Sequence, residues 1–186
     1  MSIQINLISL NPKKTPMIKA IKIKMPVSDE VVRSLSIGDQ LEISGNIFCG
    51  RDAVLPQVVK LLDEKGPNGL GVRLQGGAIF HTAVSPAGIG PTTSSKAEIQ
   101  GTMAALSKYG IKLHIGKGAL SDETVQMLAT VNSIFVVTPP VTALFNNTMR
   151  SQRIVAFENE GMEAFFEINV KDFPAIVAIA HGKSIF

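Results

Sequence analysis

The segment KAEIQGTMAALSKYGIKLHIGKGALSDETVQMLATVNSIFVVT, residues 96–138, decides the fold class. Residues 96–109 have the composition of a helix that Gly110 ends, and the alternating IKLHI that follows is typical of a strand. Ser121, followed by two acidic residues, predicts the start of a second helix, and SIFVVT at 133–138 has the pattern of a buried strand. This repeated order of helix, glycine turn and strand predicts a layered α/β domain.

Strand patterns dominate both ends of the chain. In IKIK, residues 21–24, isoleucine and lysine alternate, which predicts an edge strand with its lysines in water. Residues 39–49 read as two short strands broken at Gly45, and residues 165–170 and 175–180 as two closing strands. Strands at both ends of an α/β middle favour a mixed sheet over a purely parallel one.

Two further helix starts precede the middle segment. Ser28, followed by two acidic residues, has the pattern of an N-cap, and Asp52 is expected to cap a longer helix that Gly66 ends. A strand predicted at 78–83 leads into a loop rich in Gly, Pro, Ser and Thr at 85–95, which is the least ordinary segment of the chain.

Length and composition indicate one globular domain over residues 1–186. Hydrophobic residues make up 45% and charged residues 18%, which excludes global disorder. The net charge of +3 is spread too thinly for sequence-independent binding of nucleic acid. The apolar run at 173–180 is too short to cross a bilayer, and the first residues lack the pattern of a signal peptide. We expect a cytoplasmic protein without nucleic-acid or membrane partners.

Cysteine and histidine usage limits the chemistry that this chain supplies alone. The single Cys49 excludes an intrachain disulfide and any cluster held only by this chain's thiolates, and we expect it to be a buried thiol. The three histidines, His81, His114 and His181, are too scattered in sequence to suggest a metal site. His114 lies inside IKLHI and is expected to be a structural strand residue.

Two glycine-rich stretches suggest a nucleotide site but lack the required spacing. GIGPTTSSK at 88–96 and GIKLHIGKG at 110–118 both miss the phosphate-loop pattern, and Lys117 precedes a glycine where the magnesium-binding hydroxyl should stand. A generic phosphate or nucleotide binder is therefore the weakest hypothesis.

Three groups suited to anions each precede an expected helix: Arg51, the pair Thr92-Thr93, and Lys117. Helix N-termini attract carboxylates, and cationic or hydroxyl groups strengthen that attraction. Each group also has a structural interpretation, since Arg51 could pair with a nearby acid, the threonines could cap a helix, and Lys117 could lie in an exposed turn.

Five sequence blocks carry a resemblance to a known family, and their order supports it. They are Gly50-Arg51-Asp52-Ala53, Gly90-Pro91-Thr92-Thr93-Ser94, Ile115-Gly116-Lys117-Gly118, Glu160-Gly161-Met162-Glu163-Ala164 and Asp172-Phe173-Pro174-Ala175-Ile176-Val177. In this order they resemble the β subunit, or C-terminal domain, of class I iron–sulfur fumarases and L(+)-tartrate dehydratases. The resemblance runs from about Met25 to Phe186, and residues 1–24 are poorly matched.

The resemblance implies a swivelling β/β/α-type domain that acts with an α subunit. That α subunit would hold a [4Fe-4S] cluster on three cysteines, whose open iron acts as a Lewis acid in hydrating or dehydrating a small dicarboxylate. The chain is thus expected to be the β subunit of a hydro-lyase that is active only with its partner. The isolated chain could form a homodimer.

The resemblance also implies roles for individual residues. Arg51 matches the carboxylate-clamping arginine of the family, and Lys117 matches a lysine that binds a substrate carboxylate. Thr92 matches the threonine with a catalytic proton-transfer or positioning role, with Thr93 and Lys96 beside it as substrate-binding residues.

Departures from the family pattern support a rival hypothesis. Lys96-Ala97-Glu98 stands where the family has Arg-Met-Asp, and Leu55 stands where it has a histidine. Lysine keeps the charge of arginine but loses its planar fork. The rival is a noncatalytic subunit of the same fold that binds a small anion or serves as a scaffold.

Overall fold

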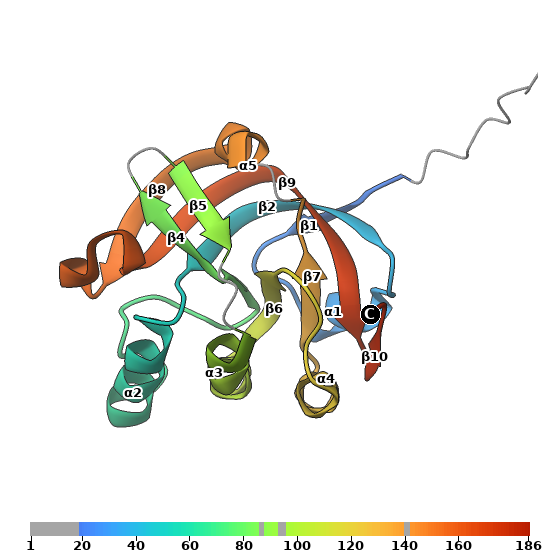
Figure 1. Cartoon of the computed structure of the whole chain (residues 1–186), viewed down its shortest axis with the longest axis horizontal. Coiled ribbons are helices and arrows are strands. Elements are labelled where there is room, and N and C mark those ends of the chain that lie inside the picture. Colours follow the sequence, from blue (N-terminus) through green and yellow to red (C-terminus); the bar gives the residue numbers. More distant parts are fainter. Residues whose placement is uncertain (1–18, 86–87, 93–95, 140–141) are drawn as a thin grey trace, which may run out of the picture.

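The computed structural model describes residues 19–85, 88–92, 96–139 and 142–186, in which strands and helices form three layers (Figure 1). The strands are β1 (Ile21–Lys24), β2 (Gln40–Cys49), β3 (Gly77–Phe80), β4 (Thr82–Ser85), β5 (Gly88–Thr92), β6 (Ile111–Gly116), β7 (Ile134–Val137), β8 (Met149–Ala156), β9 (Phe165–Ala180) and β10 (Lys183–Ser184). The helices are α1 (Asp29–Ser34), α2 (Leu55–Lys65), α3 (Lys96–Lys108), α4 (Asp122–Thr130), α5 (Thr142–Thr148) and the 3₁₀ segment η1 (Glu158–Glu163).

The main sheet is mixed, which confirms the expected α/β class. Its order is β1-β2-β3-β6-β7-β9-β10, with β8 also on β9, while β4 and β5 form a separate antiparallel pair. Strands β1, β2, β3, β6 and β7 pair in parallel, and β9 is antiparallel to both β7 and β2. The pairing of β9 with β2 and β7 closes five strands into a ring.

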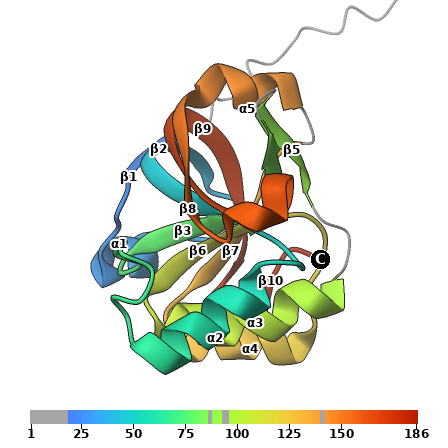
Figure 2. The same ribbon diagram turned by 90° about the vertical axis from the view of Figure 1, so that its left-hand side faces the viewer.

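Successive side chains of β3 enter two different hydrophobic clusters, because a strand alternates its faces. Phe80 belongs to the cluster inside the strand layers, whereas its neighbour Ile79 packs with α2 and α3 residues such as Val58 and Leu106. Helices α2, α3 and α4 lie side by side across this second face of the sheet (Figure 2). Each fully buried Ile, Leu or Phe contributes roughly 1.5–3 kcal/mol of transfer free energy.

The helix termini confirm most of the expected caps. The side chains of Ser28 and Ser121 accept hydrogen bonds from the backbone N–H groups of Val31 and Thr124, and Gly66 ends α2 with a positive φ of 75°. None of the helices in the described part of the chain combines the length and the apolar run that a bilayer crossing needs.

Two predicted strand breaks are wrong, for one shared reason. Of the segment 39–49, residues 40–49 form one strand, β2, and the two predicted closing strands form one strand, β9. The register of this pair shifts near Ser44, where the backbone N–H of Asp172 donates to the Ser44 hydroxyl at 2.9 Å and Asp172 adopts a φ of 53°. A bulge of this kind absorbs extra residues while the ladder continues on both sides.

The region from 78 to 95 also differs from its prediction. The single strand expected at 78–83 is divided at His81 into β3 and β4, which belong to different sheets. The expected loop at 85–95 contains β5, which pairs with β4. Strand β8, helix α5 and segment η1 were not predicted, because their composition lacks clear periodicity or cap signals.

Candidate functional site

The carboxyl ends of the parallel strands meet at one edge of the sheet. Cys49 of β2 is the register partner of Phe80 of β3, and Phe80 is the partner of Ile115 of β6. The chain therefore leaves β2 and β6 at the same level, immediately before Arg51 and Lys117. The carboxyl edge of an α/β sheet is the usual place for a ligand, since loops and helix N-termini gather there.

Strand β5 brings the backbone of Thr92 to the same edge. Thr82, which begins β4 just beyond the end of β3, is the register partner of Thr92. Thr93 lies outside the described residues, and the side chains of Thr92 and Lys96 are not among those described. The roles expected for these three residues stay predictions.

Arg51 is held by a carboxylate from a distant part of the chain. Its Nε donates to both carboxylate oxygens of Glu163 in η1, at 2.8 and 2.6 Å, and its Nη2 forms an ion pair with the same group. The hydrogen bond to Glu163 raises the pKa of Arg51. The side chains of Arg51 and Glu163 are 31% and 24% exposed, so the pair lies at the surface of the site. Glu163 contacts the guanidinium through Nε and Nη2 and makes no hydrogen bond or ion pair with Nη1.

Lys117 is the second cation of this edge. It is exposed and follows β6 directly, four residues before the Ser121 cap of α4. In the described part of the chain no carboxylate lies within ion-pair distance of Lys117. This arrangement agrees with both open interpretations, an exposed turn and an anion ligand.

Asp52 is not the cap of α2, which corrects the sequence-based expectation. The helix starts at Leu55, and the N-cap position is Val54, whose side chain makes no capping bond. The carbonyl of Arg51 accepts from the backbone N–H groups of Val54 and Leu55 instead. One oxygen of Asp52, Oδ1, is buried and has no hydrogen-bond partner among the described residues.

Two histidines that are far apart in sequence meet beneath this edge. His81 Nε2 lies 3.3 Å from His114 Nδ1, and His114 Nε2 lies 2.9 Å from the Ser107 hydroxyl of α3. Both imidazole rings are fully buried, and burial lowers the pKa of His81 to about 3 and that of His114 well below its ordinary value. Sequence scatter concealed the pair, because only the β3–β6 register brings the two residues together.

Cys49 has the environment of a structural thiol, as expected. It is fully buried, and burial raises the pKa of the thiol far above its ordinary value. In the described residues no three His, Cys, Asp or Glu side chains gather in a way that could hold a metal ion. A cluster bound by three cysteines does not fit a chain with one cysteine.

An apolar groove of about 460 Å³ lies beside Glu163. It is lined by Val84, Ser85, Gln152, Arg153, Ile154, Gly161, Met162 and Phe166. Met162 is 56% exposed and Ile154 38% exposed, so large apolar side chains face solvent next to the residue that holds Arg51.

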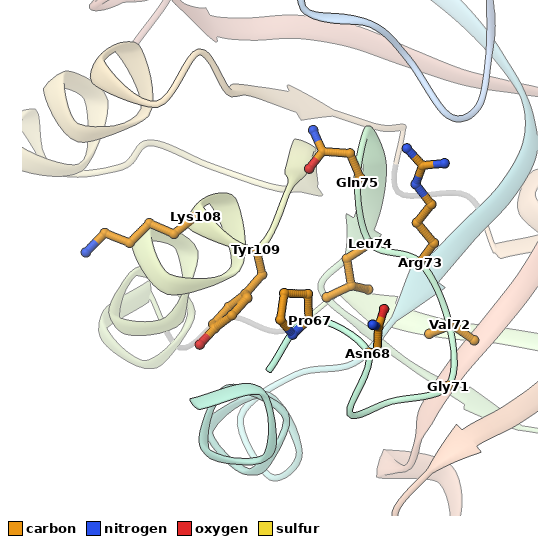
Figure 3. A pocket seen from close by; sticks show the side chains of 9 residues that line it. All are labelled: Pro67, Asn68, Gly71, Val72, Arg73, Leu74, Gln75, Lys108 and Tyr109. Carbon is orange, nitrogen blue, oxygen red and sulfur yellow. The ribbon is translucent and has the colours of Figure 1, made fainter. Parts of the chain in front are cut away.

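A larger cavity, of about 530 Å³, lies at the opposite end of the parallel strands, before β3 and beside the last turn of α3 (Figure 3). It is lined by Pro67, Asn68, Gly71, Val72, Arg73, Leu74, Gln75, Lys108 and Tyr109. The side chains of Arg73 and Lys108 extend away from each other, so they do not converge on one anion (Figure 3). Cavity size alone therefore does not identify the functional edge.

Comparison with known proteins yields a family match over nearly the whole chain. The profile described as fumarase C-terminus matches residues 4–186. The chain is 29% identical over 181 residues to a Geobacillus stearothermophilus protein provisionally named fumarate hydratase class I. This alignment covers 90% of the chain and 34% of the Geobacillus protein, so the chain spans about a third of that relative's length.

Two further relatives have related names. A Methanocaldococcus jannaschii protein provisionally named L(+)-tartrate dehydratase subunit beta is 28% identical over 170 residues, which cover 83% of this chain and 85% of that protein. The anaerobic class I fumarate hydratase of Escherichia coli is 25% identical over 162 residues, which cover 81% of this chain and 29% of the enzyme.

Proposed function

The chain belongs to the fumarase C-terminus family, and from this premise we propose that it is the β-type subunit of an iron–sulfur hydro-lyase. The reaction would be the reversible hydration of a small unsaturated dicarboxylate, or the dehydration of a hydroxylated one such as malate or tartrate. This chain would supply groups that bind the substrate carboxylates, and it would be inactive without an α-type partner.

The observation that carries the proposal is the convergence of three segments on one sheet edge. Arg51 follows β2, Lys117 follows β6, and Thr92 ends β5 against β4. One strand, β3, separates β2 from β6, which corresponds to about 10 Å between the points where the two chains leave the sheet. Two long cationic side chains can close over that span onto the ends of a small dicarboxylate.

Arg51 and Lys117 would each hold one end of the substrate, with Lys96 assisting. The planar guanidinium suits a carboxylate better than an ammonium does, because two N–H groups can donate in parallel. Glu163 already orients the guanidinium through its Nε–Nη2 side. A substrate carboxylate would then meet a cation whose direction is set before binding, which lowers the entropy cost of binding.

Thr92 would lie near the reacting carbon, with Thr93 next to it. An ordinary hydroxyl is a poor base, so Thr92 would need an activating group from the partner subunit. The main base of the reaction is likewise assigned to the partner.

The [4Fe-4S] cluster of the proposal belongs to the partner and not to this chain. The single cysteine is buried and cannot replace a set of three, and no step assigned to this chain passes through the cluster. The name of the M. jannaschii relative, a subunit beta, supports a partner of the α type. The apolar groove beside Glu163 is the surface on which we expect that partner to pack, because it exposes large apolar side chains next to Arg51.

Co-expression tests the proposal directly. The chain is produced with an α-type chain, iron and sulfide are restored under anaerobic conditions, and turnover of fumarate, malate, tartrate and mesaconate is measured. Turnover of at least one dicarboxylate is expected, and the chain alone serves as the inactive control. A correctly assembled complex that converts none of the four would contradict the proposal.

A noncatalytic anion-binding or scaffolding subunit is the alternative function. The observation in its favour is that Glu163 binds the Nε–Nη2 side of Arg51, so this carboxylate of the chain itself already pairs with the cation. The replacement Lys96→Arg separates the two functions, since restoring the planar fork should raise turnover only where a working site exists. Unchanged turnover in the Lys96→Arg variant would favour the scaffolding subunit.

A further inference from the structure

Strand β5 has a bulge immediately before Thr92, the residue that the proposed function places near the reacting carbon. Val84 pairs with Ile89, and Thr82 pairs with Thr92. Between these two pairs β4 contributes one residue, whereas β5 contributes the two residues Gly90-Pro91. A bulge of this kind bends the strand and re-aims the residue that follows it. The conformation of β5 at the bulge therefore decides how the chain delivers Thr92 to the carboxyl edge.

The Thr82 hydroxyl holds the bulge on the β4 side. Its Oγ1 donates to the Gly90 carbonyl at 2.8 Å, the usual length of a hydrogen bond between a hydroxyl and a carbonyl, and lies 3.3 Å from the Ala83 carbonyl. A hydroxyl has one proton to donate, so the shorter contact with Gly90 is the main one. Thr82 is 1% exposed, which shields this hydrogen bond from competing water. A side chain of β4 thus binds β5 at the point where the bulge interrupts the backbone ladder.

The two bulged residues suit this arrangement. Pro91 has no backbone N–H, so it cannot donate to β4, and proline inside a sheet is confined to edges and bulges. Gly90 brings its backbone close to β4, since a Cβ at this position would lie 3.0 Å from the Ala83 carbonyl oxygen. The residue types therefore agree with a bulge that a side-chain hydrogen bond keeps in place.

Helix α5 provides a second attachment for β5. The Oδ1 of Asn146 accepts a hydrogen bond from the backbone N–H of Ile89 at 3.1 Å, one residue before the bulge. The fit is close at the neighbouring Gly88, where a Cβ would overlap the same oxygen. Asn146 and Thr82 therefore bind consecutive residues of β5, Ile89 and Gly90, from two different elements.

The alternative to the bulge is a defined register. Without the bulge, the pairing of Val84 with Ile89 would continue to Thr82 with Pro91, and Thr92 would move by one position. Successive residues of a strand belong to opposite faces, so a slip of one position would turn Thr92 to the other face of the pair. The bulge therefore specifies the face to which Thr92 belongs.

We propose that Thr82 is a positioning residue of the reaction: its hydroxyl, assisted by Asn146, holds the bulge at Gly90-Pro91 and so fixes the register from which Thr92 acts. The role of Thr92 in the reaction rests on the proposed function, whereas the attachment of the bulge does not. Neither Thr82 nor Asn146 is a catalytic residue, because they act on the substrate only through Thr92.

NMR of the full chain measures the register. In the unaltered chain, nuclear Overhauser contacts between the strands are expected to link residue 82 with Thr92. Thr82→Val keeps the shape of the side chain but removes its donor, so a fraction of the molecules should show contacts of residue 82 with Pro91 instead. Thr82→Ser retains the hydroxyl and should retain the bulged register. Contacts of residue 82 with Pro91 alone in the unaltered chain would overturn the proposal.

A second variant and a matched control complete the NMR test. Asn146→Ala removes the acceptor of the Ile89 N–H and should shift the register in the same direction as Thr82→Val, in a smaller fraction of the molecules. The control is Ser133→Ala, which removes a buried hydroxyl that donates to the Ile111 carbonyl at 2.9 Å, at the amino end of the parallel strands. This variant should keep the bulged register. An unchanged register in both Thr82→Val and Asn146→Ala would overturn the proposal.

Kinetics of the reconstituted enzyme test the link to the reaction. Thr82→Val is expected to lower kcat about tenfold and to change KM less than about twofold. The reason is that the proposed function assigns Thr92 to the reacting carbon and leaves the carboxylates to Arg51 and Lys117. Thr82→Ser should restore kcat, and Ser133→Ala should change neither constant, although it also removes one buried hydrogen bond between a hydroxyl and a carbonyl.

The outcomes separate this inference from the proposed function. Equal kcat in Thr82→Val and in the unaltered enzyme would overturn the positioning role. Absence of turnover in the unaltered enzyme would contradict the proposed function, and the NMR register would then decide whether Thr82 and Asn146 hold the bulge.

Discussion

The two ends of the same parallel strands differ in whether their buried polar groups have partners. At the amino end, Lys112 is 10% exposed, and its Nζ lies 2.8 Å from Asp29 and donates to the Val131 carbonyl at 3.1 Å. At the carboxyl end, Asp52 and His81 each keep a buried polar atom without a partner in the described residues. Buried polar groups are normally satisfied, so the exceptions need an explanation.

Under the proposed function, the amino end would serve stability and the carboxyl end would serve binding. The hydrogen bond from Lys112 lowers the pKa of Asp29, and Asn132 donates to the same carboxylate at 3.1 Å. The polar groups at the amino end are therefore paired with one another. The carboxyl end instead holds the histidine pair, the unpaired atoms and an arginine tied to a distant carboxylate. Changes at the amino end should therefore move stability alone, whereas most changes at the carboxyl end should move function.

Acid should produce the largest effect, through the histidine pair. The folded chain keeps His81 neutral, because burial lowers its pKa to about 3, but the unfolded chain protonates it below a pH of about 6.5. The unfolded state then binds more protons, so stability is retained above pH 6.5 and lost as pH falls. Between pH 7 and pH 5 we expect about 2 kcal/mol of extra loss from His81, measured by urea unfolding.

The control for this pH effect is the double variant His81→Leu with His114→Leu, which lacks both titrating groups. Its unfolding free energy should depend less on pH than that of the unaltered chain. Equal pH dependence in the double variant and the unaltered chain would show that the buried pair is not neutral.

Loss of the arginine at the carboxyl edge should have the next largest effect. Arg51→Gln removes a charge-assisted carboxylate contact and is expected to lower kcat/KM roughly 10- to 100-fold in the reconstituted enzyme, with a small change in Tm. Arg33→Gln, an exposed arginine of α1 that pairs with Asp29 and Glu30, is the matched control. Similar losses in both variants would remove the functional distinction between the two ends.

Loss of the lysine at the amino end should affect stability alone. Lys112→Met keeps the aliphatic stem but removes the contacts with Asp29 and the Val131 carbonyl, which is expected to cost about 1–2 kcal/mol of unfolding free energy. Turnover per folded molecule should stay unchanged. A selective fall in kcat/KM would mean that the amino end also contributes to the reaction.

Replacement of the residue that orients Arg51 should have the smallest effect. Glu163→Gln keeps one acceptor for the guanidinium but removes the charge, so KM is expected to rise about threefold with kcat nearly constant. Steady-state kinetics with Glu30→Gln as the control measures this change, since Glu30 also pairs with an arginine, Arg33, but on α1 and outside the lining of the groove. A lower KM would show instead that Glu163 competes with substrate for Arg51.

Helices α1 and α4 and the edge strand β1 could be predicted because their signals are local. Ser28 and Ser121 cap helices as their acidic neighbours indicate, and the alternation of 21–24 produced the expected edge strand. The predicted breaks in β2 and β9 failed because a bulge depends on the partner strand. The prediction that Asp52 caps a helix was wrong, because the choice between capping and burial depends on the fold around the residue.

Within the candidate site, the sequence determined which chemical groups are present: an arginine, a lysine, threonines and one thiol, with the family to which they belong. Tertiary structure alone decided that Glu163 holds Arg51 across 112 residues and that His81 meets His114. The physical reason is that caps and periodicity act within a few residues of the chain. Strand register instead fixes contacts between segments whose separation in sequence carries no information about distance.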